Sequence, residues 1–455
     1  MSEFFGSVWW LIVTLGLLIT FHEYGHFVVA RRCGVKVLKF SIGFGPALWK
    51  RYDRHGTEFA IAAIPLGGYV KMLDERDPDA VVAPQEIAGA FNRKSLGARI
   101  AITAAGPAFN LIFTVAALWL MFVIGKPDYQ PVIGHVGGVA ASAGLAAGDR
   151  IRTVDGRQID NWTDAGDRLV AAGMAHQDVT LTLARPDHSE RTVTLALSKL
   201  PADLDQQAIY DRIGLIPQQM AIPPVVGEVA PDSAAAQAGL RKGDRLESIA
   251  GEPIGDWREV SRAVTAHAAA DRALALVVRR GAQTLTLQAT PRPNPAAGTI
   301  GAPPWLLGIG PEPIEPHYDA TLRYNPLAAI PRALATTWEQ TRQTLGMLGR
   351  MVTGQASLKN LSGIITIAEV ANASAQLGLA WFLNFLALIS LSLAILNLLP
   401  IPILDGGALL YYLIELAKGS PVSERVQIAG QYVGLVLLVA LMGLALYNDI
   451  LRHVS

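Results

Sequence analysis

Hydrophobic residues gather in four long runs along the chain, and the stretches between them alternate polar and apolar positions. The four runs cover residues 8–30, 99–125, 379–399 and 427–448. A helix needs about 20 apolar residues to cross a bilayer, so each run is long enough to be a membrane span. The pattern therefore predicts an α-helical polytopic membrane protein with four transmembrane helices, in which residues 1–125 and 379–455 form the membrane part.

The stretch between the second and third spans contains an internal repeat. Residues 133–162 and 226–257 share an Ala-Gly-Leu step, a Gly-Asp-Arg step and a closing tryptophan, and alternating runs typical of hairpin strands follow each copy. A unit of about 90 residues is too long for a solenoid repeat. We expect two inserted α+β domains, at 126–220 and 221–310. Their motif resembles PDZ domains of the bacterial protease-associated kind, which implies either a peptide-binding strand edge or a rigid spacer.

Two shorter patterns lie beside the spans. Residues 41–72, inside the loop 31–98, alternate β-type runs with glycine and proline. We expect a membrane-associated β-hairpin segment that lines a cavity, because non-helical backbone at membrane depth needs protein or water around it. An amphipathic helix is expected within 311–378, packed on the second repeat or on the bilayer surface. Its apolar face would consist of Ile330, Leu334, Trp338, Leu345, Leu348 and Val352.

Charge and composition orient this protein and exclude some classes. Basic residues crowd the loop between the first two spans, and Lys418 and Arg425 lie between the last two. Both loops are therefore expected to be cytoplasmic, with the repeats and both termini on the far side. A net charge of zero gives no reason to expect a nucleic-acid partner. A single cysteine, Cys33, excludes an intrachain disulfide and a cysteine-based zinc site, and the start lacks a signal-peptide pattern, so the first span is expected to be retained.

The first span carries ionisable residues where lipid would be expected. His22, Glu23 and His26 form the pattern HExxH, which places both imidazoles on one helical face. Histidines at this spacing can bind one Zn²⁺, with the glutamate beside them as general base. Ionisable groups at membrane depth cost about 2.5–3.5 kcal/mol each on insertion scales, which favours a functional site. The alternative is a polar contact between helices.

Catalytic zinc usually keeps three protein ligands and one open position. The segment "NLLPIPILDGG" ends the third span and supplies Asp405 as the third ligand, at the same cytoplasmic end as the histidines. The prolines cannot continue the helix, and we expect Gly406 and Gly407 to let the backbone turn back so that the carboxylate points inward. An ordinary loop aspartate is the alternative.

Peptide hydrolysis at such a site would need an unwound substrate held extended beside the metal. The hairpin segment is suited to this, and its "PLGGY" motif supplies Gly67, Gly68 and Tyr69 as candidate substrate-binding residues. Asn110 and Asn397 lie near the same level and could anchor the substrate or the developing oxyanion. Either asparagine could equally make a hydrogen bond between helices.

Taken together, these motifs resemble the site-2 protease family of intramembrane metalloproteases. The resemblance spans nearly the whole chain, from "HEYGH", "GFGP", "PLGGYVKM" and "GPAFN" to the tandem repeats and "NLLPIPILDGG". It implies that His22, His26 and Asp405 bind Zn²⁺, that Glu23 is the catalytic base, and that Asn397 contacts substrate.

By the same resemblance, the enzyme lies in the bacterial inner membrane with periplasmic PDZ domains that exclude bulky substrates. It would cut a single-span anti-sigma factor already trimmed on its periplasmic side, as part of the envelope stress response, and remnant signal peptides would be a second substrate class. Two alternatives stay open from the residues alone: a membrane-anchored scaffold whose metal is structural or absent, and a membrane-bound peptidase acting on soluble loops.

Overall fold

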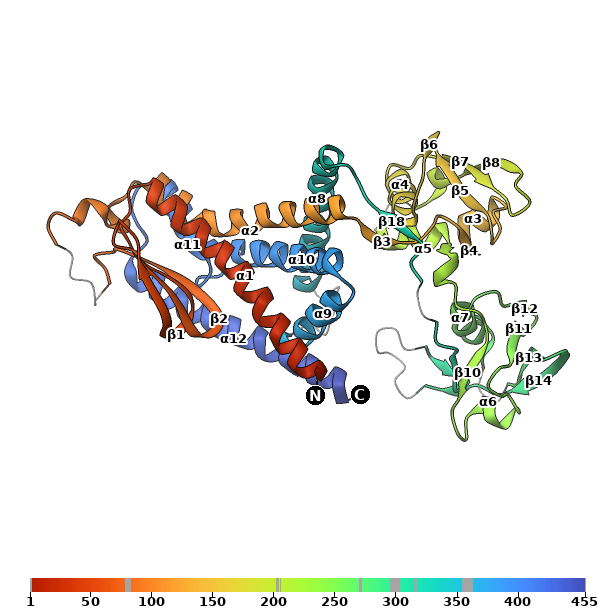
Figure 1. Cartoon of the computed structure of the whole chain (residues 1–455). Helices are drawn as coiled ribbons and strands as arrows, with labels where there is room; N and C mark the ends of the chain where they lie inside the picture. Colours follow the sequence, from red (N-terminus) through yellow and green to blue (C-terminus); the bar gives the residue numbers. More distant parts are fainter. Residues whose placement is uncertain are drawn as a thin grey trace. The chain divides into compact units, whose positions relative to one another are not determined.

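The computed structural model describes most of the chain, in two compact units (Figure 1). The first unit combines Met1–Lys126 with Arg323–Ser455, and the second is Pro127–Leu322. The segment 311–378, expected as one piece, is divided between them. The described residues are 2–77, 83–201, 204, 206–269, 272–294, 303–314, 317–353 and 363–454.

Helices dominate the first unit, and four of them are long and apolar enough to cross a membrane, as the sequence predicts. Helix α2 packs against both α1 and α10. Hydroxyls join α2 to α10: Ser390 Oγ donates to the Asn110 carbonyl, and Thr114 Oγ1 to that of Ala387. The helices are α1 Ser2–Arg32, α2 Leu96–Ile124, α8 Pro326–Val352, α9 Ile364–Gln376, α10 Leu379–Leu398, α11 Asp405–Lys418 and α12 Glu424–Val454, with the short helices η1 Ile87–Gly89 and η2 Phe91–Arg93 before α2.

The segment after α1 forms the expected β-structure, as β1 Val37–Tyr52 and β2 Glu58–Met72. Both strands bend, so each contributes two segments, and the four segments lie side by side as a small antiparallel sheet. Along one line across it, Arg51 is paired with Phe59, Phe59 with Phe40, and Phe40 with Val70. Rings of Phe40 and Phe59 pack edge-on against Phe27 of α1, at 5.6 and 5.5 Å between centroids, which ties the sheet to the first span.

Helix α8 is amphipathic, as its periodicity indicates, and crosses α2 and α10 (Figure 1). Its buried face consists of small residues, Ala329, Ala333 and Thr337. Trp119 Nε1 of α2 donates a hydrogen bond to the Pro326 carbonyl at the start of α8. Within the first unit the expected apolar face is exposed along Ile330, Leu334, Trp338 and Leu345, while the Val352 side chain lies outside the described part.

The side chain of Asp449 on α12 caps the N-terminus of α9. Asp449 is fully buried and accepts hydrogen bonds from the backbone N–H groups of Gly363, Ile365 and Thr366 and from the Thr366 hydroxyl, at 2.7–3.1 Å. The first N–H groups of a helix have no partner within it. Asp449 therefore supplies a helix cap from another helix.

The second unit contains two modules with the same order of elements, each around its own hydrophobic core. Each has a four-stranded antiparallel sheet, β6-β5-β7-β8 in the first module and β12-β11-β13-β14 in the second. The Gly-Asp step of each repeat makes the same turn, in which Asp149 and Asp244 accept from the backbone N–H groups of Ala146 and Arg241.

The element bounds of this unit follow the chain. The first module comprises β4 Ile133–Val136, α3 Gly138–Ser142, β5 Arg150–Val154, β6 Arg157–Gln158, α4 Trp162–Met174, β7 Val179–Ala184, β8 Glu190–Leu195, η3 Leu197–Lys199, α5 Gln206–Ile213 and β9 Leu215–Pro217. The short helix η4 Gln218–Met220 follows and packs against β4 of the first module. The second module comprises β10 Val226–Val229, α6 Ala234–Gln237, β11 Arg245–Ile249, β12 Glu252–Pro253, α7 Trp257–His267, β13 Leu274–Arg280, β14 Gln283–Ala289, β15 Arg292–Pro293, β16 Trp305–Leu306 and β17 Ile309–Pro311. At its boundary, β3 Lys126–Asp128 pairs with β18 Ala320–Leu322.

Candidate metal centre

Two imidazoles face each other on the C-terminal half of α1. His22 and His26 lie one turn apart, as the HExxH spacing requires, and their rings stand edge-on with centroids 4.9 Å apart. Their Nε2 atoms are 3.3 Å apart. Both nitrogens therefore point at one place beside the helix.

Asp405 brings a carboxylate to the same place. It is the first residue of α11, directly after the proline-rich break that ends α10. Its Oδ2 lies 3.2 Å from His22 Nε2 and 3.4 Å from His26 Nε2. This oxygen is buried and accepts no hydrogen bond from any described residue. A buried oxygen in this state calls for a ligand.

The three donor atoms fit a zinc ion. Bonds of about 2.0–2.1 Å in a tetrahedral site put neighbouring ligand atoms about 3.3 Å apart. The three separations in the triad are 3.2, 3.3 and 3.4 Å. Two imidazoles and one carboxylate leave the fourth tetrahedral position for water or substrate, which is the arrangement of catalytic rather than structural zinc.

Helix α2 orients both imidazoles. His26 Nδ1 lies 2.8 Å from the Ile102 carbonyl, and because a carbonyl only accepts, Nδ1 carries the proton and Nε2 is free to bind metal. The Asn110 side chain is fully buried, with its amide Nδ2 3.3 Å from His22 Nδ1, while its Oδ1 has no partner among the described residues. When His22 Nε2 binds metal, Nδ1 carries a proton, and a flip of the Asn110 amide would bring Oδ1 to this ring as the acceptor.

Glycines allow these elements to approach. A Cβ on Gly106 would lie 2.3 Å from His26 Nε2 and 2.7 Å from His22 Nε2, and one on Gly25 would lie 2.4 Å from the Ala105 carbonyl oxygen. Any side chain at either position would push α1 and α2 apart. Sequence reasoning missed both glycines, although each lies inside a motif it singled out, HEYGH and GPAFN.

The glycines after Asp405 have a different role from the expected one. Both lie in the first turn of α11, and neither is in the left-handed region, so the expected backbone reversal is wrong. A Cβ on Gly406 would lie 2.2 Å from the Leu399 carbonyl oxygen, and one on Gly407 2.4 Å from that of Ile401. They let α11 begin against the end of α10, which directs Asp405 at the histidines.

The β-hairpin reaches Glu23. A Cβ on Gly68 would lie 3.4 Å from Glu23 Cγ, and the Val70 backbone hydrogen-bonds to the Glu23 carboxylate. Gly67 has a positive φ of 145°, and a Cβ there would overlap the Phe44 ring. Among the expected substrate-binding residues of the hairpin, Gly68 therefore lies beside Glu23.

The other three expected substrate contacts lie less directly on the triad. Tyr69 stacks on Phe44, with centroids 6.1 Å apart. Asn397, near the end of α10, is half-buried, and its side chain makes no hydrogen bond to another described residue. The side chain of Asn110 contacts His22, so this residue orients a metal ligand instead of facing a substrate. Of these three residues, Asn397 is the one whose polar group is available to a substrate.

Known proteins are similar to this chain over nearly its whole length. A family model for peptidase family M50 matches residues 10–441. A Xylella fastidiosa protein named as a zinc metalloprotease is 49% identical over 99% of this chain and 100% of its own length. Regulator of sigma-E protease RseP of Escherichia coli K12 is 45% identical over 97% of both chains, and the regulator of sigma E protease of Haemophilus influenzae is 38% identical over 99% of this chain and 100% of its own.

The fold and the triad define a multi-pass membrane metalloprotease that uses Zn²⁺. More specifically, the chain belongs to peptidase family M50, the site-2 proteases, and the relatives named above share nearly its full length.

Proposed function

We propose that His22, His26 and Asp405 bind the zinc ion and that Glu23 is the general base for hydrolysis of a peptide bond within the membrane. The observation that carries this proposal is the triad itself: three donor atoms on α1 and α11, separated by tetrahedral-edge distances, with a buried carboxylate oxygen that has no described donor. Bound there, zinc supplies Lewis acidity toward a water molecule and the scissile carbonyl.

The surrounding residues would divide the remaining work. Glu23 takes the proton of the attacking water and returns it to the leaving amine. Ile102 and Asn110 keep the imidazoles in the tautomers that bind metal. Gly68, beside Glu23, together with Gly67 and Tyr69 holds the substrate backbone extended, and Asn397 contacts it from the end of α10. An extended backbone is required because a helical peptide bond is shielded by its own hydrogen bonds.

The proposed substrates are single-span membrane proteins that have already lost their periplasmic domain. The position of the triad on apolar helices supports a substrate that reaches it through the membrane. Relatives named as regulators of sigma-E protease support an anti-sigma factor as one such substrate, within an envelope stress response. Remnant signal peptides, which are also single spans, are a second proposed class.

The proposed topology places the triad toward the cytoplasmic side of the bacterial inner membrane. Basic residues in the loop 33–95 support this orientation, and so do Lys418 and Arg425, at the helix ends that flank the loop 419–423. We infer that the two repeats are PDZ domains on the periplasmic side, which exclude substrates with large periplasmic parts. Their common order of elements and separate cores support the first half of this inference.

The test uses one tagged single-span substrate in two forms, full-length and trimmed on its periplasmic side, reconstituted with the purified protein. Product mass spectrometry should place the cut inside the substrate's span, in the trimmed form only. Glu23→Gln should abolish the cut. A cut in a soluble loop would instead favour a membrane-bound peptidase of ordinary specificity.

A further inference from the structure

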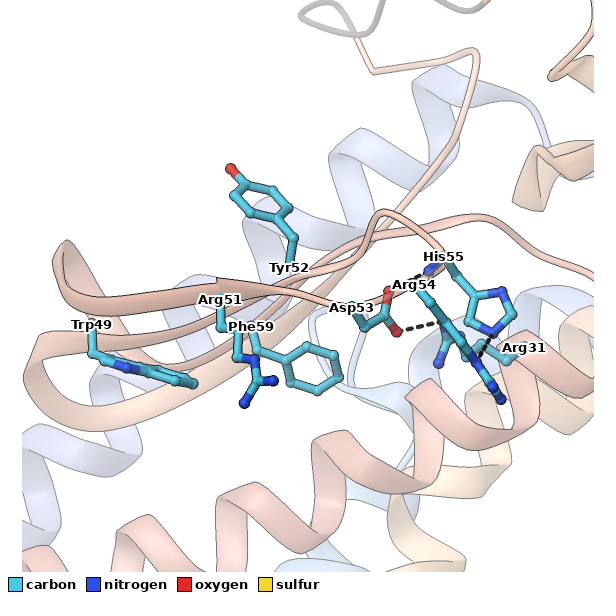
Figure 2. A pocket seen from close by; sticks show the side chains of 8 residues that line it. All are labelled: Arg31, Trp49, Arg51, Tyr52, Asp53, Arg54, His55 and Phe59. Atoms are coloured by element: carbon cyan, nitrogen blue, oxygen red, sulfur yellow. Dashed lines mark hydrogen bonds and ion pairs between the residues drawn. The ribbon is translucent and has the colours of Figure 1, made fainter.

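A basic pocket lies away from the metal centre, between the end of α1 and the turn that joins β1 to β2 (Figure 2). It has a volume of about 600 Å³. Its polar lining consists mainly of Arg31, Arg51, Asp53, Arg54 and His55. None of these residues takes part in the metal centre described above.

The pocket holds more positive charge than it neutralises. Arg31 forms an ion pair of 2.6 Å with Asp53, whose other oxygen accepts from the backbone N–H groups of His55 and Thr57 (Figure 2). Both oxygens of the Asp53 carboxylate are therefore already used, one by Arg31 and the other by the backbone of the turn. Arg51 and Arg54 form no ion pair with any residue in the described part of the chain. Two positive charges are left for a ligand.

Apolar and aromatic side chains continue the pocket on one side. Trp49 and Tyr52 line it and are 50% and 58% exposed, and nearby Leu48 and Phe44 are 74% and 45% exposed. Arginine beside tryptophan, tyrosine and bare aliphatic groups is the composition of a membrane–water boundary. Arg31 also ends the first span, so the pocket lies where that apolar helix leaves the membrane.

We propose that this pocket binds the headgroup of an anionic phospholipid of the cytoplasmic leaflet, attracted by the positive charges of Arg51 and Arg54, with its acyl chains along Leu48 and Trp49. The sidedness rests on the proposed topology. Clusters of basic residues at the cytoplasmic surface attract anionic lipid. A substrate tail fits less well, because the cytoplasmic flanks of single-span proteins are themselves enriched in lysine and arginine.

The lipid site is connected to the catalytic centre through the sheet. Arg51 is paired with Phe59, Phe59 with Phe40 and Phe40 with Val70, whose backbone hydrogen-bonds to Glu23. A headgroup that fixes the turn therefore also fixes the strand beside the catalytic base. Anionic lipid should raise the rate of cleavage without being part of the reaction.

The experiment measures lipid binding to the full chain by native mass spectrometry in neutral detergent. Phosphatidylglycerol, phosphatidylcholine and soluble glycerol phosphate are titrated separately. The pocket variant is Arg51→Gln with Arg54→Gln. The matched control, Lys418→Gln with Arg425→Gln, removes two exposed positive charges from the other cytoplasmic loop. Zinc content serves as the check that each variant is folded.

Wild type and the control should each bind phosphatidylglycerol about tenfold more tightly than the pocket variant does. Neither phosphatidylcholine nor glycerol phosphate should compete. Equal phosphatidylglycerol affinity in the two double variants would overturn the proposal, and so would glycerol phosphate binding as tightly as the lipid. Unchanged lipid binding with slower cleavage of an acidic-flanked substrate would instead assign the pocket to substrate. Because binding is measured without cleavage, failure of the proposed protease activity would be recognised separately.

Discussion

At the residue scale, the metal triad depends on neighbours that never touch the metal. Gly106 is the clearest case, because its missing side chain is the space that both imidazole rings occupy. Asn110 and Ile102 then set which nitrogen of each ring carries the proton. The triad is thus a property of the contact between α1 and α2 as well as of HExxH.

Replacing Gly106 with alanine should disrupt the site. The added Cβ would lie 2.3 Å from His26 Nε2, so the two helices must separate or a histidine must move. We expect zinc affinity to fall at least tenfold, measured by competition with a chromogenic chelator. Gly97→Ala is the matched control on the same helix, because a Cβ there meets nothing within 4 Å. Equal zinc affinity in the two variants would show that the close approach is not needed.

Replacing Asn110 and replacing Asn397 should change different quantities, zinc affinity in the first case and catalytic efficiency in the second. Asn110→Ala removes the partner of His22 Nδ1, and loss of such a partner typically costs 10–100-fold in metal affinity. Asn397→Ala, which leaves the histidines untouched, should keep zinc affinity and lower kcat/KM. Zinc titration and cleavage kinetics on both variants check this. A normal zinc affinity in Asn110→Ala would indicate that Asn110 contacts the substrate and does not orient His22.

At the element scale, short polar links hold the helices in place. The sequence predicts the four spans and the β-segment because each has a strong local period. It does not predict that α11 begins at Asp405, because that depends on Gly406 and Gly407 packing against the backbone of the preceding break. Close approach of backbones is a tertiary feature that residue type alone does not reveal.

Asp449→Ala should destabilise the attachment of α9 to α12. Three N–H groups and one hydroxyl lose their acceptor, and hydrogen bonds to a charged group contribute about 1.5–3 kcal/mol each at most. We expect a lower Tm in detergent and faster proteolysis within 363–376. Asp449→Asn, which keeps one acceptor oxygen, should lie between the two. Identical Tm values for all three proteins would contradict a capping role.

The second module should lose stability in acid through Asp244. Burial tends to raise the pKa of this carboxyl, but hydrogen bonds from Arg280 and the Arg241 backbone lower it below its ordinary value. A lowered folded-state pKa contributes stability above the unfolded pKa of about 3.9, and this contribution is lost as the pH falls through the folded pKa.

Arg280→Gln should therefore lower the unfolding free energy at neutral pH and reduce the further loss below about pH 4. Urea unfolding of the unit 127–322 at a series of pH values measures both effects. Arg279→Gln is the control, since Arg279 pairs with Glu247 on the surface. Matching pH profiles for the two variants would show that Asp244 is not the source of the loss of stability in acid.

At the scale of the whole molecule, membrane and soluble parts are interleaved so that one site is built from both ends of the chain. HExxH and the aspartate after "NLLPIPIL" were sufficient to predict which three residues meet, because zinc chemistry restricts the ligand types and the spans restrict their depth. Sequence could not predict the helix packing that sets their distances. Nor could it predict the pocket at Arg51 and Arg54, which requires the sheet to fold back toward the end of α1.

Metal content of the purified full chain is the direct test of a zinc site formed by α1 and α11. We expect about one zinc ion per chain in wild type and in Glu23→Gln, and close to none in Asp405→Ala or His22→Ala, with all four proteins folded by circular dichroism. One retained zinc ion in Asp405→Ala, at wild-type affinity, would contradict the convergence of α1 and α11 on a single metal.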